Sequence, residues 1–208
     1  ALPAESPETG RVNRLTVLAL KARAALYAAS PLFNPTGDKE LWHRAALANK
    51  ELLDAADAAK MKLIDDYAKL WTKNNYKDAT SEIIFGRRAD RESSGMETSN
   101  FPAGLENCKG GNCPTQNLVD AFPMANGYPI DDPNSGYDDQ NPYANRDPRL
   151  SLYIVYNGST MGNNNTVIDT SVDNTSNNDG LNREQGHSTR TGYYLRKHLR
   201  EDVVLNAS

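Results

Sequence analysis

Two alanine-rich segments, residues 12–29 and 42–59, limit most strongly what this chain can fold into. Both place apolar residues three and four positions apart, the spacing that aligns side chains on one face of an α-helix. The first segment carries this pattern at Val12, Leu15, Ala19, Ala22, Leu26 and Ala29. It should end at Ser30-Pro31, because a proline disfavours helical backbone in the residue before it.

The second segment predicts another helix, with Asp38 after Gly37 as the candidate N-cap. Its apolar positions are Trp42, Ala45, Leu52, Ala56 and Ala59. This spacing predicts that the Trp42 side chain lies in the core. The 13 alanines from residue 19 to residue 59 would let the two helices approach closely. We therefore predict an antiparallel helix hairpin within residues 9–70, which leaves part of its apolar surface for further helices.

The composition changes in the next zone, residues 81–150, which is rich in Gly, Pro, Asn and Asp. These residues favour turns and loops, so the zone is expected to be mostly irregular and to carry the binding surface. Within it, residues 82–85 predict a short strand, and residues 115–120 predict a short helix after Pro114.

The last zone, residues 151–208, opens on a segment rich in β-branched and aromatic residues. This segment, residues 151–156, predicts a strand. Eight asparagines then crowd residues 157–182, which contain few apolar side chains. We expect a long loop without core residues there, with order returning at residues 191–195.

The charge of the chain argues against several partners. It has 23 Lys and Arg against 27 Asp and Glu, a net charge of −4, and so lacks the broad basic surface of a nucleic-acid-binding protein. No apolar run approaches the roughly 20 residues of a membrane helix. The sequence also lacks the common phosphate-binding, zinc-protease and serine-hydrolase motifs.

The two cysteines, Cys108 and Cys113, flank Lys-Gly-Gly-Asn and leave two alternatives open. They can close a small disulfide loop in an oxidising compartment, since the glycines let the backbone turn sharply. They can also remain free thiols. A zinc site would need four ligands, and the pair supplies only two.

Four aspartates gather in the loop-rich zone, at Asp131, Asp132, Asp138 and Asp139. Carboxylate oxygens are ligands that calcium prefers, so a calcium site is one interpretation, although the spacing departs from the helix-loop-helix calcium pattern. A solvated acidic loop is the simpler interpretation. A third is that two of these carboxylates form the catalytic pair of a glycoside hydrolase.

Aromatic residues in the same zone are candidates for carbohydrate binding. They lie among Asn, Gly, Asp and Pro, at Phe101, Tyr128, Tyr137 and Tyr143. An exposed ring offers a flat apolar face to the C–H groups of a sugar, while nearby amides and carboxylates can bond its hydroxyls. The alternative is that these rings fold the loops back onto the domain.

An ordered set of segments resembles the SusD/RagB family of outer-membrane lipoproteins. They are Gly10-Arg11, residues 18–34, Glu82–Phe85, Pro114–Met124, Asn141–Tyr143, Asn145–Arg149 and Thr191–Lys197. The resemblance implies a mainly α fold, in which tetratricopeptide-like helix pairs support long irregular loops and a few short strands. Within it, Arg146-Asp147-Pro148-Arg149 is expected to fix a turn through charge-assisted hydrogen bonds.

The same resemblance implies the function. Family members are non-catalytic glycan-binding proteins at the cell surface of Gram-negative bacteria, which deliver oligosaccharides to a TonB-dependent, SusC-like outer-membrane transporter. It implies no cofactor, leaving calcium as the one candidate. The chain resembles a central part of a longer lipid-anchored protein, because typical members are more than twice as long. Alternatives from other classes are a glycoside hydrolase and a helical-repeat scaffold for protein partners.

Overall fold

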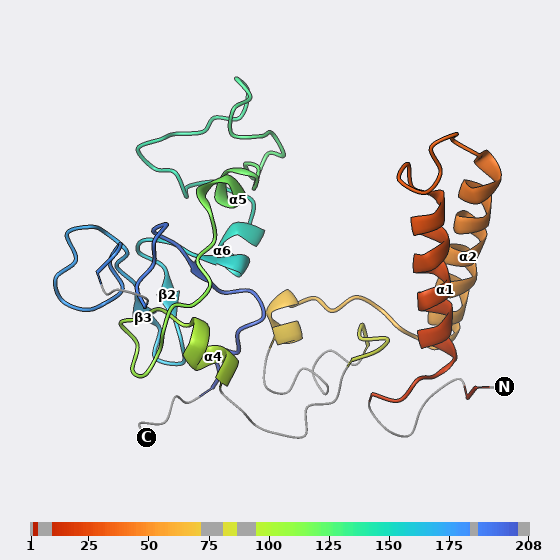
Figure 1. Ribbon diagram of the computed structural model, residues 1–208, viewed down its shortest axis with the longest axis horizontal. Coiled ribbons are helices and arrows are strands. Elements are labelled where there is room, and N and C mark those ends of the chain that lie inside the picture. The colour runs from red at the N-terminus through yellow and green to blue at the C-terminus, as the bar shows by residue number, and fades with distance from the viewer. Residues whose placement is uncertain (1, 4–9, 72–80, 87–94, 184–186, 204–208) are drawn as a thin grey trace. The chain divides into compact units, whose positions relative to one another are not determined.

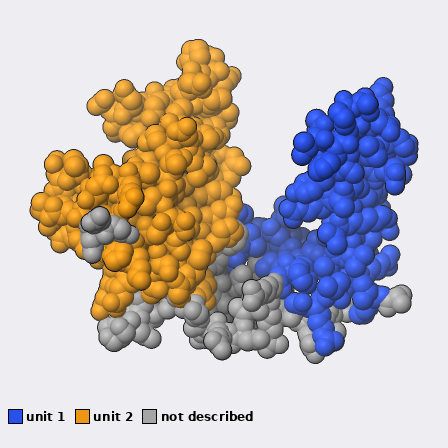
Figure 2. Space-filling view, in the orientation of Figure 1, with its two compact units in different colours: residues 1–70, 74–91 blue, residues 71–73, 92–208 orange. Residues whose placement is uncertain are grey.

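The computed structural model describes residues 2–3, 10–71, 81–86, 95–183 and 187–203. The chain consists of two compact units (Figure 2). One comprises residues 1–70 and 74–91, and the other comprises residues 71–73 and 92–208. The described residues are mainly helical, with a few short strands and long loops, which confirms the predicted fold class. No helix among them combines the length and the apolar composition needed to cross a membrane.

Helix α1 (Arg14–Ala29) starts at a side-chain cap and ends where the proline signal predicts. The Asn13 side-chain oxygen accepts a hydrogen bond from the backbone N–H of Thr16 at 2.9 Å, which satisfies one donor of the first turn. At the other end, Ser30 is extended, with ψ 152°, the conformation that proline favours in its predecessor.

Helix α2 (Lys39–Ala58) runs antiparallel beside α1, so the predicted hairpin is confirmed (Figure 1). Asp38 is its N-cap, as expected: the side chain accepts a bond from the backbone N–H of Glu40 at 2.9 Å. The buried residues of the two helices are mostly small, namely Leu15, Leu18, Ala22, Ala29, Ala45 and Ala48. Small side chains at the contact allow the two helix axes to lie close together.

The prediction that Trp42 lies in the core is wrong. Its side chain is 46% exposed, and Leu53 on the same helix is 61% exposed. Two helices bury only the strip along which they touch. Helical spacing therefore identifies residues that share a face, but it does not supply a partner for the whole of that face.

The remaining elements are short. The 3₁₀ helix η1 (Tyr67–Trp71) is followed by α4 (Gly95–Asn100), α5 (Gln116–Asp120) and α6 (Arg149–Tyr153). Strand β1 (Ile154–Val155) pairs antiparallel with β4 (Tyr194–Leu195), and β2 (Thr160–Met161) pairs antiparallel with β3 (Thr166–Val167). Helix α5 confirms the helix predicted over residues 115–120.

Two strand predictions need correction. Residues 82–85 form turns and irregular backbone, and Phe85 is 51% exposed. In residues 151–156, the last turn of α6 precedes β1, so only Ile154 and Val155 are in a strand. The helix arises because Pro148, at its N-cap, has a fixed φ that suits a helix start.

The asparagine-rich stretch contributes to the core, contrary to expectation. One hydrophobic cluster collects buried residues from distant parts of the second unit: Phe101, Cys108, Val155, Met161, Ile168, Tyr194 and Leu199. Met161 and Ile168 belong to that stretch. Asparagine side chains replace regular secondary structure as backbone partners there. For example, Asn174 Nδ2 donates to the carbonyl oxygen of Asp169 at 2.8 Å.

A buried ion pair joins α4 to the C-terminal part of this unit. Glu97, whose side chain is 1% exposed, accepts hydrogen bonds from Arg200 Nε at 2.9 Å and Arg200 Nη2 at 3.0 Å. Burial alone would raise the pKa of Glu97, but the bonds from Arg200 outweigh it and lower the pKa below its ordinary value of 4.5. The carboxylate is thus stabilised by the fold.

Replacing Glu97 with Gln should therefore lower the free energy of unfolding by about 3 kcal/mol at neutral pH, because a buried pair loses one charge. The wild-type advantage should shrink as the pH falls below the ordinary carboxyl pKa, since the unfolded state then takes up the proton before the folded state does. Urea unfolding at pH 7 and pH 4 measures both effects. The exposed pair Lys50–Asp54 provides the control: Asp54→Asn should change stability by about 0.5 kcal/mol or less.

Candidate functional site

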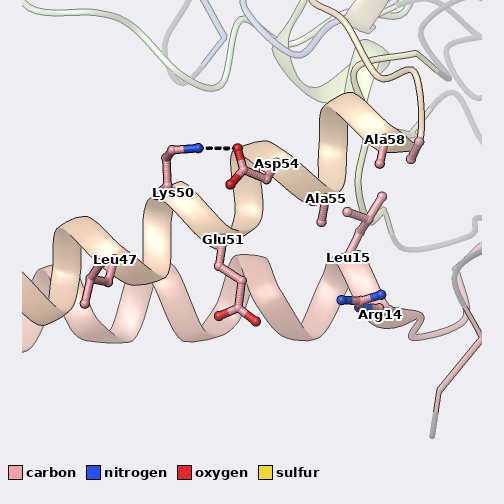
Figure 3. A pocket seen from close by; sticks show the side chains of 9 residues that line it. Arg14, Leu15, Leu47, Lys50, Glu51, Asp54, Ala55 and Ala58 are labelled. Carbon is pink, nitrogen blue, oxygen red and sulfur yellow. Dashed lines mark hydrogen bonds and ion pairs between the residues drawn. The ribbon is translucent and has the colours of Figure 1, made fainter.

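The helix hairpin contains an open cavity of about 600 Å³ between the start of α1 and the second half of α2 (Figure 3). Its walls include Leu15, Leu47 and alanines of α2. Three of the four charged side chains that line it have charged partners, and Arg14 is the fourth: Lys50 Nζ lies 2.5 Å from Asp54 Oδ1. Glu51 accepts a bond from Lys21 at 2.6 Å. The cavity therefore offers apolar walls and few polar groups that could orient a sugar.

The second unit carries a different candidate, a long loop closed at its base by backbone hydrogen bonds. We call residues 124–146 the tyrosine loop. Met124 and Arg146 form an isolated antiparallel bridge. Just inside it, the N–H of Ala125 donates to Asn145 O at 2.8 Å, and just outside it the N–H of Asp147 donates to Pro123 O at 2.9 Å. The ends of the loop are thereby held together.

Arg146 anchors the loop at its base. Its guanidinium is buried and donates to three carbonyl oxygens, those of Pro142 at 2.8 Å, Val119 at 2.6 Å and Phe122 at 2.7 Å. These bonds tie the C-terminal end of the loop to Val119 in α5 and to Phe122, which lies two residues before the loop begins. Next to it, Asp147 and Arg149 form an ion pair of 2.5 Å. The turn-fixing role predicted for residues 146–149 agrees with this arrangement.

Tyr128 is the most exposed of the predicted binding aromatics, at 44%. It lies at the end of a tight turn in which Gly127 has φ +89°, a conformation that favours glycine. The N–H of Met124 donates to Tyr128 O at 2.9 Å, and the N–H of Tyr128 donates to Asn126 Oδ1 at 3.1 Å. The backbone beneath the ring is therefore fixed while the ring faces solvent.

Tyr137 and Tyr143 are half-buried. The Arg146 guanidinium lies 5.6 Å from the Tyr137 ring centroid, so a cation lies over one face of that ring. The Tyr143 ring stacks on Tyr156 with centroids 4.1 Å apart, and its hydroxyl donates to Tyr193 Oη at 3.3 Å. Burial, together with this hydrogen bond, raises the pKa of Tyr143. Tyr143 therefore helps to hold the loop against Tyr156 and Tyr193.

Phe101 lies elsewhere. It has no exposed surface and belongs to the cluster around Val155 and Tyr194. A ring enclosed on all sides offers no face for stacking on a sugar, so we leave Phe101 out of the candidate site. The structure thus places three of the four predicted aromatics, Tyr128, Tyr137 and Tyr143, in one loop.

The four aspartates considered in the sequence analysis all lie in the tyrosine loop, and the hydrogen bonds described for them go to different neighbouring residues. Asp132 Oδ1 accepts the backbone N–H of Asn134 at 2.7 Å. Asp138 accepts bonds from Asn141 Nδ2 and from the backbone N–H of Gln140, which lower its pKa. These are turn-forming contacts. Within the described part of the chain, no group of three or more His, Cys, Asp or Glu side chains could hold a metal ion, so the calcium interpretation of Asp131, Asp132, Asp138 and Asp139 gains no support.

The two cysteines are free thiols in this structure. Cys108 is buried in the core, and burial raises the pKa of its thiol to about 11, with a smaller contribution from Asp179. Cys113 donates to Gly110 O, and Cys108 donates to Glu106 O, both at 3.4 Å. Of the two alternatives that the sequence leaves open, the structure has the free thiols, and no Cys108–Cys113 disulfide is formed here.

The sequence did not reveal the contacts of Tyr193 that support the tyrosine loop. Tyr193 Oη donates to Gln116 Oε1 at 2.8 Å, and Tyr193 also contacts Tyr143 edge-on, with centroids 6.4 Å apart. With Val119, Leu150 and Ile154, Tyr193 forms the buried cluster against which Tyr143 and Tyr156 pack. Gln116 and Tyr193 both lie in segments that carry the family resemblance, so the sequence did mark them. The spacing of residues along the chain could not show that two residues so far apart are in contact.

Comparison with known proteins decides the family. The model of the SusD family matches residues 81–207, more than half of the chain. The chain belongs to the SusD family. Carbohydrate-binding proteins of this family are non-catalytic, so the glycoside-hydrolase interpretation of the loop aspartates is not supported.

A solved structure shows the fold of this SusD-family chain independently. It is described as a SusD-like carbohydrate binding protein from Bacteroides fragilis, with 22% sequence identity and a TM-score of 0.71. The match covers 99% of this chain and 38% of that one, so this chain spans well under half the length of its relative. A search of curated protein sequences found no match.

The geometry predicts that Arg146 controls the order of the tyrosine loop. Replacing it with Lys keeps the charge but cannot reproduce three directed bonds, so unfolding should become easier by about 2 kcal/mol. Amides of residues 124–146 should exchange hydrogen faster, as measured by mass spectrometry. The matched control is Arg149→Lys, at an exposed arginine nearby, which should leave exchange in the loop unchanged. Equal protection in both variants would contradict the anchoring role.

Proposed function

We propose that this protein captures oligosaccharides at the outer surface of the cell and passes them to a TonB-dependent, SusC-like transporter in the outer membrane. Membership of the SusD family, over residues 81–207, is the observation that supports this most directly. Proteins of that family are typically outer-membrane lipoproteins. A lipid anchor and the outer-membrane location are accordingly part of the proposal.

The tyrosine loop is the proposed sugar-contacting surface. Tyr128 supplies the main stacking platform, because its ring is exposed while its backbone is held by the turn at Gly127. Tyr137 and Tyr143 are half-buried and contribute the parts of their side chains that remain accessible. A sugar ring placed on Tyr128 would bury C–H groups against an apolar face and keep its hydroxyls at the periphery.

Polar side chains around these rings provide the directional contacts. The loop contains exposed amides at Asn126, Gln140 and Asn141, together with the four aspartates. Each hydrogen bond to a sugar hydroxyl replaces one to water, so its net contribution is only about 1 kcal/mol. Affinity in the micromolar range or weaker is expected, on the order of −8 kcal/mol at most. Weak binding suits a protein that must release its ligand to a transporter.

The scaffold alternative is favoured by a different observation. Helices α1 and α2 leave large apolar side chains in solvent, among them Leu20 at 68% and Leu53 at 61% exposed. If the chain served only as a helical-repeat scaffold for protein partners, alanine at Tyr128 and Tyr137 would leave sugar uptake unchanged and would disturb complex assembly instead.

The proposal is tested by titration calorimetry of the protein against a panel of soluble oligosaccharides. Tyr128→Ala should weaken binding of the best ligand about tenfold, equivalent to 1.4 kcal/mol, because tyrosine is enriched among the few contacts that carry most of a binding energy. Tyr27→Ala is the matched control, because Tyr27 is similarly exposed, at 53%, but lies on α1. It should leave the affinity unchanged. Absence of heat with every class of glycan would overturn the proposed function.

A further inference from the structure

The net charge of the protein is concentrated around the tyrosine loop. Residues 115–160 contain six aspartates, two arginines and no Glu, Lys or His, which gives a formal charge of −4. The whole chain also carries −4, so the remainder is neutral on balance. Residues 115–160 therefore hold the whole net charge of the sequence. Among the contacts that the structure describes, the cations of Arg196 and Lys197 meet this stretch only near its end, at Ser151, Tyr153 and Thr160.

The two arginines of this region do not offset the loop aspartates. The Arg146 guanidinium is buried and bonds three carbonyl oxygens beneath the loop. Arg149 is paired with Asp147, which follows the loop, and their hydrogen bonds hold the pKa of Asp147 at about 2. Neither cation is directed at Asp131, Asp132, Asp138 or Asp139 by any contact that the structure describes.

The hydrogen bonds that these aspartates receive come from uncharged donors. Asp132 is bonded by Asn134, Asp138 by Gln140 and Asn141, and Asp139 by the Gln140 side chain at 3.2 Å. Such donors stabilise the carboxylates in their ionised form without neutralising them. Asp131, Asp138 and Asp139 are also exposed, so their charges face solvent.

These charges lie close to the proposed stacking rings. Asp138 directly follows Tyr137, and Asp131 is three residues from Tyr128, hence at most about 11 Å away between Cα atoms. The screening length is about 8 Å at physiological salt and becomes longer as salt is removed. A negative group on a bound sugar would therefore experience several of the carboxylates at once.

We propose that the tyrosine loop selects neutral glycans and rejects anionic ones such as uronate-containing or sulfated chains. This inference rests on the proposed glycan-binding function and adds its substrate class. Neutral sugar hydroxyls can donate hydrogen bonds to the loop carboxylates, which are acceptors only. A sugar carboxylate or sulfate has no proton to donate at neutral pH, and it is repelled by these groups.

The test compares two forms of one ligand: the neutral oligosaccharide that binds best in the panel, and the same oligosaccharide with its primary hydroxyls oxidised to carboxylates. Calorimetry at pH 7 and 20 mM salt should show the oxidised form binding at least tenfold more weakly. The difference should shrink severalfold in 0.5 M salt, because screening shortens the range of the repulsion. Equal affinity of the two forms at low salt would overturn the inference.

A charge-neutral variant separates repulsion from lost hydroxyl contacts. Changing Asp131, Asp132, Asp138 and Asp139 to Asn keeps an acceptor oxygen for each turn, and should restore binding of the oxidised ligand at low salt about tenfold. The smaller variant, Asp131→Asn with Asp139→Asn, changes fewer turn contacts and should give part of this gain if the fourfold variant is unstable. No gain in either folded variant would overturn the inference. If neither ligand form binds the wild type, the proposed function itself fails.

Discussion

The buried guanidinium of Arg146 is the contact on which the candidate site depends. A loop of 23 residues has a large conformational entropy to lose, and it contains no regular secondary structure apart from the bridge at its base. Arg146 meets this requirement by donating to three carbonyl oxygens, those of Pro142, Val119 and Phe122. The cationic donor strengthens each of these bonds, so one side chain joins the C-terminal end of the loop to α5 and to the segment that precedes the loop.

Aromatic residues around this anchor fall into two groups by burial. Tyr143, Tyr156 and Tyr193 pack against each other and against the small core of Val119 and Leu150. Tyr128 remains outside, on a turn held by backbone bonds. The packed rings give the loop a stable base, and the proposed function uses the exposed ring as the surface for a glycan. A recognition loop needs both, because a mobile loop would lose entropy again on binding.

The helix hairpin and the second unit show two ways of ordering a chain of modest apolar content. In the hairpin, alanines such as Ala22 and Ala45 permit close contact between the helices. Each alanine buries less apolar surface than a larger side chain would. In the second unit, Asn174 and similar side chains bond the backbone where no helix or strand does so. Both units belong to a chain of the SusD family, whose carbohydrate-binding proteins are non-catalytic.

Local signals in the sequence determined the hairpin, its boundary at Ser30-Pro31, the cap at Asp38 and the family. They did so because capping, proline geometry and ordered motifs act over a few residues. They could not determine that Trp42 is exposed, that Phe101 is enclosed, or that Met161 and Ile168 enter the core. Only the tertiary structure decided these, because burial depends on which distant segments pack together. The residues next to a position in the sequence do not specify those distant partners.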